Sequence, residues 1–145
     1  MGRYHAGMTA AGAGTTVRPI FGILATAAVS PKLREISVWN NTGTACEFRL
    51  VYLTGGTPGA TVTAFADDLG MLATPTCLAK QLWTADATIV ADCGPRIRLG
   101  AADGSSAFHV FGDNGIRPLL GATAAIGLVP VGTGQIVSVS FAWDE

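Results

Sequence analysis

Two histidines and one pair of carboxylates are the residues of this 145-residue chain that could do acid–base chemistry or bind a metal ion. His5 and His109 are the only histidines, and neither lies at ligand spacing from another histidine, a cysteine or a carboxylate. His109 lies in an alternating stretch, where a strand histidine with satisfied hydrogen bonds is more common than a general base. Asp67 and Asp68 are adjacent, so on a strand their side chains point apart, which favours a solvated loop or a helix cap. We therefore expect no metal site, no cofactor and no enzyme activity.

Two arginines and two tryptophans are the remaining candidates for binding. Arg96 and Arg98 flank Ile97 on one face of a strand, where they could bind a carboxylate, a phosphate or an acidic patch on a partner. A solvated face is the alternative. Trp39 and Trp83 could stack on sugars, although a single tryptophan on a strand more often belongs to the core or to an interface.

Composition limits the class of protein. Charged residues make up 13% of the chain, against roughly 25% in ordinary soluble domains, while hydrophobic residues make up 49%. A chain this poor in charge is expected to hide surface against other subunits, which predicts a homo-oligomer. An alanine-rich composition typical of a high-GC genome is the alternative explanation. The net charge of −1 and the dispersed basic residues argue against nucleic-acid binding.

The cysteines and the apolar runs exclude further classes. Cys46, Cys77 and Cys93 form no close pair and are odd in number, which argues against a disulfide or metal scaffold. No apolar run approaches the ~18 residues that span a bilayer, so no membrane partner is expected. The N-terminal residues lack the apolar core of a signal peptide, which predicts synthesis in the cytosol.

The strongest structural signal is the alternation in Gln135–Trp143, which is typical of a strand. Alternation divides the side chains of this segment into two rows, one on each face of the strand. One row is large and apolar, and the other is mostly small and could lie under a neighbouring strand or subunit. Because an exposed edge this apolar would aggregate, the strand is expected to be paired inside a sheet. Its predicted core side chains are Val137, Val139, Phe141 and Trp143.

Two further strands, Lys32–Asn40 and Cys46–Leu53, flank an Asn-Asn-Thr-Gly turn and are predicted to form a hairpin. In the first of them Ile36 and Val38 are expected to face inward, with Trp39 on the opposite row. Thr54–Thr76 is rich in turn residues, with at most a short strand near Ala60–Phe65, and loops of this length are often functional. The other strand candidates are Val17–Val29, Leu78–Thr84, Ile89–Val90, Arg96–Leu99, Ser106–Phe111, Ile116–Leu120 and Ala124–Val131.

This spacing of about eight short strands, without a convincing amphipathic helix, predicts an all-β antiparallel sandwich or barrel. Eight strands favour a jelly roll. Residues 1–16 lack both helical and alternating apolar spacing and are predicted to form an extended N-terminal arm, leaving residues 17–145 for the sandwich. The arm carries Arg3, Tyr4 and His5, a cluster that is unusual for a segment without a binding role, because arginine and tyrosine are favoured anchors in interfaces.

Several short phrases of the chain carry a resemblance to a known kind of protein. They are Thr16-Val17-Arg18-Pro19-Ile20, Arg34-Glu35-Ile36, Leu53-Thr54-Gly55-Gly56-Thr57-Pro58-Gly59, Gly134-Gln135 and Phe141-Ala142-Trp143-Asp144-Glu145. In these phrases the sequence resembles small β-rich proteins encoded among the virion structural genes of tailed bacteriophages. Some proteins of that kind look like jelly-roll decoration, or cement, proteins that trimerise on the outside of the capsid. No functional residues are carried over with this resemblance.

The resemblance implies a structural role on the capsid surface of a virion, after synthesis in the host cytoplasm. The expected partners are further copies of the chain, as a trimer, and the major capsid protein, whose capsomers the chain would bridge. The alternative is a tail-associated receptor- or glycan-binding jelly roll that uses Trp39, Trp83 or the Thr54–Thr76 loop. The candidate capsid or subunit interface residues are Arg3, Tyr4, His5, Trp39, Arg96 and Arg98.

Overall fold

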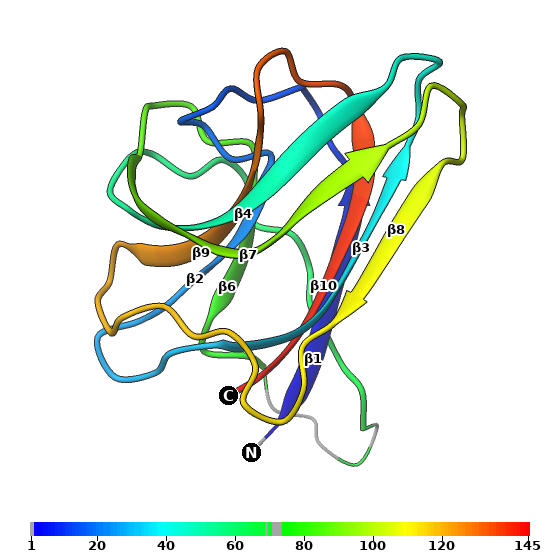
Figure 1. The fold of residues 1–145 in the computed structure, drawn as a ribbon. Coiled ribbons are helices and arrows are strands. Elements are labelled where there is room, and N and C mark those ends of the chain that lie inside the picture. The colour runs from blue at the N-terminus through cyan, green and yellow to red at the C-terminus, as the bar shows by residue number, and fades with distance from the viewer. Residues whose placement is uncertain (1, 69, 71–73) are drawn as a thin grey trace.

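Two antiparallel five-stranded sheets face one another in a sandwich (Figure 1). A computed structural model describes residues 2–68, 70 and 74–145. Within this part every regular element is a strand, which confirms the predicted all-β class. None of the described segments is a helix long and apolar enough to span a lipid bilayer. The strands are β1 (Arg3–Thr9), β2 (Phe21–Leu24), β3 (Lys32–Asn40), β4 (Cys46–Thr54), β5 (Phe65–Ala66), β6 (Leu78–Gln81), β7 (Thr88–Leu99), β8 (Ser106–Val110), β9 (Ala124–Pro130) and β10 (Val137–Asp144).

The two sheets combine strands that are far apart in the sequence. The first sheet has the order β5-β1-β10-β3-β8, and the second sheet has the order β6-β2-β9-β4-β7. Every strand pair is antiparallel. The alternating C-terminal segment forms β10, which lies in the middle of the first sheet between β1 and β3. The expectation that this strand is paired inside a sheet is confirmed.

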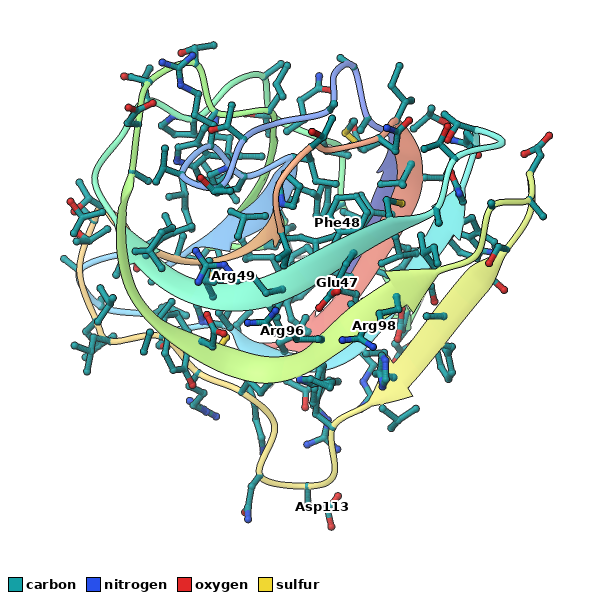
Figure 2. The ribbon with its side chains drawn as sticks, turned by 45° about the horizontal axis from the view of Figure 1, so that its top comes forward. Glu47, Phe48, Arg49, Arg96, Arg98 and Asp113 are labelled. Carbon is teal, nitrogen blue, oxygen red and sulfur yellow. The ribbon has the colours of Figure 1, made fainter. Side chains whose placement is uncertain are left out.

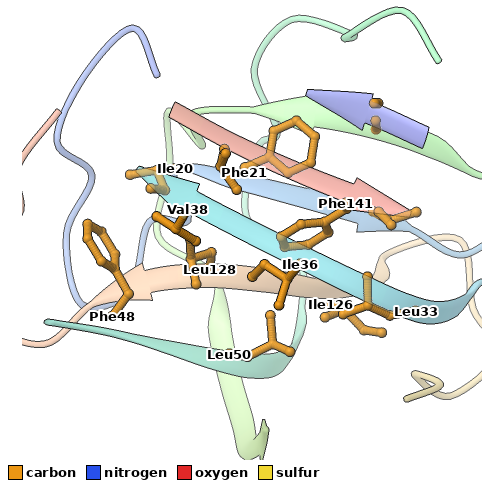
Figure 3. Close-up of a cluster of buried hydrophobic side chains, with 14 of the residues drawn as sticks. Ile20, Phe21, Leu33, Ile36, Val38, Phe48, Leu50, Ile126, Leu128 and Phe141 are labelled. Carbon is orange, nitrogen blue, oxygen red and sulfur yellow. The ribbon is translucent and has the colours of Figure 1, made fainter. Parts of the chain in front are cut away.

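The inward side chains of the two sheets meet in one core (Figure 3). Val137, Val139, Phe141 and Trp143 are at most 1% exposed, as the alternation predicts. The ring of Phe141 meets the ring of Phe21 from the opposite sheet edge to face, with ring centres 4.9 Å apart. Such aromatic pairs add about 0.5–1.5 kcal/mol beyond the burial of their area.

A second apolar layer covers part of the outer side of the second sheet. On β4 and β9, residues of this layer alternate with residues of the core, so they face away from it. Trp83, in the segment after β6, packs on them and is held by a backbone hydrogen bond from its N–H to Pro19 O. This part of the second sheet is thus covered on both sides. The buried members of this layer are Val51, Leu53, Trp83, Ala87, Ala125 and Val129.

The N-terminal segment is part of the sandwich, so the predicted extended arm over residues 1–16 is wrong for β1. This strand pairs with β10 along its whole length, beginning with Arg3 opposite Asp144, and its other edge pairs with β5. Tyr4 and Ala6 point into the core and are buried. Glycine, alanine and threonine provide little apolar bulk, which conceals the strand in the sequence. A strand between two neighbours does not need that bulk, because pairing on both edges holds it.

The two best-alternating central strands lie where they are predicted, but they do not form the predicted hairpin. β3 has the predicted bounds, with Ile36 and Val38 buried and Trp39 on the outer face. β3 pairs with β10 and β8 in the first sheet, whereas β4 pairs with β7 and β9 in the second. The turn between them therefore crosses from one sheet to the other.

Asn40 explains why this turn is a corner and not a hairpin. Its fully buried side chain donates from Nδ2 to the carbonyl oxygens of Thr44 at 2.8 Å and Gly100 at 2.9 Å. Its Oδ1 accepts a hydrogen bond from Thr42 N–H at 3.0 Å. One amide thus joins the β3–β4 connection to the β7–β8 connection, and each bond satisfies a backbone group that the corner leaves unpaired.

Replacing Asn40 by alanine should lower the free energy of unfolding by about 1 to 3 kcal/mol, because buried carbonyl and N–H groups lose their partner. Urea unfolding followed by circular dichroism measures this change. Asn41→Ala is the matched control, since the Asn41 amide donates to Ser138 Oγ at the exposed surface. Equal losses in the two variants would contradict the structural role of Asn40.

The strand β7 differs from its prediction. The sequence predicts two short strands, Ile89–Val90 and Arg96–Leu99, but the chain continues between them as one strand of 12 residues. The register against β4 shifts twice along this pair, once between Arg49 and Val51 and once between Tyr52 and Leu53. Because β7 is an edge strand, it tolerates Pro95 without losing a central ladder bond.

The described residues form ten strands, where about eight were expected. The segment Ile116–Leu120 is not a strand and contributes only a single bridge between Ile116 and Leu33. The short strand expected at Ala60–Phe65 does not form: the two-residue β5 begins at Phe65, and Thr61 makes only an isolated bridge with Lys80. Both β5 and β6 are short and lie at sheet edges, where alternation over so few residues gives little signal.

Candidate functional site

The arginines of β7 lie on the outer face of the second sheet, beside Glu47 of β4 (Figure 2). Glu47 is directly opposite Arg98 in the ladder and diagonal to Arg96. One carboxylate oxygen lies 3.2 Å from Arg96 Nη1, and the other lies 3.2 Å from Arg98 Nε. Ile97 between them is buried, as the alternation predicts. We call Glu47, Arg96 and Arg98 the β7 arginine cluster.

The β7 arginine cluster carries surplus positive charge, because two guanidinium groups share one carboxylate. The Arg98 side chain is 79% exposed, and that of Arg96 is 53% exposed. Exposed ion pairs contribute only about 0 to 1 kcal/mol, so Glu47 does not hold the arginines firmly. Nearby, Arg49 is paired with Asp92 at 3.0 Å. The cluster can therefore release a guanidinium to bind a carboxylate or phosphate on a partner.

Arg3 and Tyr4 of the predicted N-terminal interface serve the fold itself. Arg3 donates from Nε to Asp144 Oδ1 at 3.0 Å, and this hydrogen bond raises the pKa of the guanidinium. Asp144 also lies 3.5 Å from Arg34 Nε, so one carboxylate joins three strands of the first sheet. Tyr4 is buried, with its ring 6.0 Å from that of Trp143. In this fold Tyr4 is not available as an interface anchor.

His5 has a carboxylate partner that its sequence neighbours do not indicate. Its Nδ1 lies 2.6 Å from Asp67 Oδ1, although the two residues are 62 positions apart. The imidazole also stacks on Phe65, with ring centres 5.8 Å apart. The pairing of β1 with β5 brings these groups together. A histidine and one carboxylate are too few ligands for a metal, and the described residues contain no group of three or more such side chains.

The two candidate tryptophans have different environments. Trp83 is buried in the second apolar layer, so it cannot stack on a sugar. Trp39 is 40% exposed on the outer face of the first sheet. The Thr54–Thr76 loop includes residues 69 and 71–73, which lie outside the described part of the chain.

A mainly apolar cavity of about 510 Å³ lies where β4, β7 and the chain before β9 meet. Tyr52, Val90 and Leu120 are among its lining residues. Its volume is in the range of small-molecule sites, roughly 300–1,000 Å³. The hydroxyl groups of Thr54 and Thr123 in its wall are hydrogen-bonded to each other, with their oxygen atoms 3.0 Å apart. The sequence interpretation missed this cavity, because its walls come together only through the sheet register.

The cysteines are free and protonated at neutral pH. Cys46 and Cys77 are buried, and Cys93 is partly buried. Burial raises the pKa of Cys46, and it raises the pKa of both Cys77 and Cys93 to about 12, with nearby carboxylates adding to the rise. A thiol held in its neutral form is a poor nucleophile and a poor metal ligand.

Stability should fall as the pH rises between about 9 and 12, in part because of Cys77. The unfolded chain loses this thiol proton near the ordinary pKa of 9.0, whereas the folded chain keeps it to about pH 12. Deprotonation therefore favours the unfolded state within this window. Urea unfolding between about pH 8 and pH 11 measures the slope, which should be shallower in Cys77→Ala. An unchanged slope in this variant would contradict the role of the buried thiol.

No protein-family model, curated protein sequence or solved structure matches this chain.

Proposed function

We propose that this chain is a structural protein of a virus particle, a capsid decoration protein that binds the outside of a phage head and stabilises the shell by bridging capsomers. Its partners are the major capsid protein and further copies of the chain, with a trimer as the expected assembly. The proposal begins from the resemblance of its short sequence phrases to virion proteins of tailed bacteriophages.

The strand order supports an eight-stranded jelly roll with β5 and β6 as additions at the edges. Without these two strands, the order β1-β10-β3-β8 faces the order β2-β9-β4-β7. Most successive strands then alternate between the two sheets, as in a roll of two Greek keys. Jelly rolls of this kind recur in viral capsid and lectin domains.

The surface is the observation that carries the proposal. The chain exposes many large apolar side chains although only 13% of its residues are charged. Most of the side chains that could do chemistry are hydrogen-bonded or ion-paired within the fold, which suits a protein that acts by binding a partner and not by catalysis. Large exposed apolar side chains mark interaction surfaces when they are grouped. The large apolar side chains that this chain exposes are Trp39, Phe65, Leu78, Val90, Phe108, Val110, Leu119, Leu120, Val131 and Ile136.

The β7 arginine cluster is the best candidate for attachment to a capsid protein. Arg96 and Arg98 are exposed, lie side by side and share one counter-charge. A rim of positive charge that meets an acidic patch increases the rate and the specificity of association. Arg3 is less suitable, because it is paired with Asp144.

The alternative proposal is a tail-associated module that binds a receptor or glycan. The exposed ring of Trp39 favours it, since an aromatic ring on the outer face of a sheet can stack on a sugar. Location in the particle separates the two proposals. Many copies over the head support decoration, and a few copies at the tail tip support adhesion.

The test measures binding of the purified protein to phage heads that lack it. The double variant Arg96→Ala and Arg98→Ala should bind at least about tenfold more weakly, which corresponds to about 1.4 kcal/mol. Arg18→Ala is the matched control, because Arg18 is also exposed and paired, with Asp86. Light scattering on the free protein should give a trimer. Heads that bind no protein would contradict the proposed decoration function. Equal binding by both variants would exclude the β7 arginine cluster as the attachment site.

A further inference from the structure

The strand β8 is an open edge of the first sheet. Among the described strands it pairs with β3 alone. Flanking hydrogen bonds from Phe111 N–H to Arg34 O and from Asn40 N–H to Ser105 O show that the odd-numbered residues of β8 are the ones that bond to β3. Backbone groups of an antiparallel strand point alternately to its two sides. The N–H and C=O groups of the even-numbered residues of β8 therefore point away from β3, into the open side. These residues are Ser106, Phe108 and Val110.

The other sheet edges are protected against pairing with another chain. β7 contains Pro95 and two register shifts and carries charged side chains. The outer edge of β6 is covered, because Val62 N–H bonds to Ala79 O and Gln81 N–H bonds to Ala60 O. β5 has only two residues. These are the usual means by which proteins prevent association between sheet edges, and β8, with the sequence Ser-Ala-Phe-His-Val, contains no proline, lysine, arginine or carboxylate.

Two of the three exposed side chains of β8 are large and apolar, and the third is that of Ser106. Phe108 is 61% exposed and Val110 is 63% exposed, both on the outer face of the first sheet. Trp39 lies on the same face of the neighbouring β3, opposite Ser106. An unpaired row of backbone groups and an apolar strip therefore occur together at this edge.

We propose that β8 pairs with β8 of a second copy of this chain, antiparallel about a two-fold axis at Phe108. In this register the two Phe108 residues face each other, and Ser106 of each copy faces Val110 of the other. All three outward-pointing residues then exchange backbone hydrogen bonds across the axis. The two first sheets become one continuous sheet.

The second copy is the occupant that this edge fits best, because the strand is complementary to itself. In the proposed register the inward row places His109 opposite Ala107, so the two imidazoles do not face each other. No like charges oppose one another anywhere in the pair, and like charges directly opposite are destabilising. An edge that selects a different protein would be expected to carry charge for specificity, and β8 carries none.

The contact is weak in solution. A strand of five residues buries much less than the about 800 Å² per partner of a standard interface. A two-fold contact also cannot close a three-fold ring, so it is separate from the trimer contact proposed above and could join copies of neighbouring trimers. The inference needs only the chain itself and does not rest on a role in a capsid.

Disulfide trapping of the purified full chain tests the register. Directly opposed residues of such a pair have Cα atoms about 5.5 Å apart, within the disulfide range. Oxidised Phe108→Cys should therefore give a covalent dimer, with little background from the native cysteines, of which two are buried and Cys93 is partly buried. Val90→Cys is the matched control, since Val90 is 60% exposed on the protected edge strand β7. If Phe108→Cys forms no more dimer than Val90→Cys, the proposal is wrong.

Sedimentation velocity over a concentration series gives an independent measurement. Phe108→Lys places two like charges at the axis and should weaken self-association at least about tenfold, whereas Phe108→Leu should keep it. Both changes lie on an exposed side chain, so both variants should fold. Self-association of Phe108→Lys at the native strength would overturn the proposal.

Discussion

Replacing Phe141 or Trp143 by alanine should lower the free energy of unfolding by about 3 to 5 kcal/mol. Both side chains are fully buried in β10, the central strand of the first sheet. Phe141 also loses its edge-to-face contact with Phe21, which joins the two sheets. The cavity left behind cannot collapse, because paired strands on both sides hold the backbone in place. Equilibrium unfolding in urea measures the loss.

Ser140→Ala is the control for this prediction. Ser140 lies on the opposite row of the same strand and is only partly buried, so its replacement should change stability by less than about 0.5 kcal/mol. The contrast tests the orientation of the whole strand, because a shift of one residue would exchange the two rows. Similar losses in Ser140→Ala and Phe141→Ala would show that the strand is not oriented as described.

A chain that begins at Thr16 should fail to fold as a stable monomer. The deletion removes β1, its ladder with β10 and the buried side chains of Tyr4 and Ala6. It also leaves one edge of β10 bare beside the core, and an exposed apolar edge promotes aggregation. Loss of the cooperative unfolding transition and accumulation in the insoluble fraction are the expected observations.

His5→Ala is the matched control for the truncation, because it changes an exposed side chain of β1 and leaves the strand in place. Its cost should stay within about 1 kcal/mol, the usual limit for an exposed ion pair. A truncated chain that is soluble and unfolds cooperatively would restore the interpretation of the N-terminal residues as a separate arm.

The sequence is sufficient to predict strands with full alternation and a buried face. β10 and β4 satisfy this condition, so their inward rows and most of their extents follow from period two. In β3 the row of Ile36 and Val38 does not include the buried Leu33, because the register against β10 shifts there. β1 does not satisfy the condition, since its inward row contains Tyr4 and Ala6 among small residues, and its partners on β10 are 129 to 141 positions away. Pairing between distant strands is a tertiary property that local pattern does not contain.

The candidate site illustrates the same limit. The sequence correctly predicts that Arg96 and Arg98 share a face, because they are two positions apart on a strand. The contact of these arginines with Glu47 depends on the register between β4 and β7, which the sequence does not contain. The partnership of His5 with Asp67 depends on the pairing of β1 with β5. In each case the residue types are visible in the sequence, and the partner is not.

The position of β10 between β1 and β3 also has a consequence for how the protein is made. Arg3 and Asp144 are hydrogen-bonded although 141 positions separate them, so β1 leaves the ribosome long before its partner has been synthesised. Until then β1 and β3 lack the strand that joins them, and the first sheet cannot form stepwise during translation. Folds dominated by such distant pairings form slowly, on the order of milliseconds to seconds. The nascent chain should therefore remain open, and accessible to chaperones, until residues 137–144 emerge.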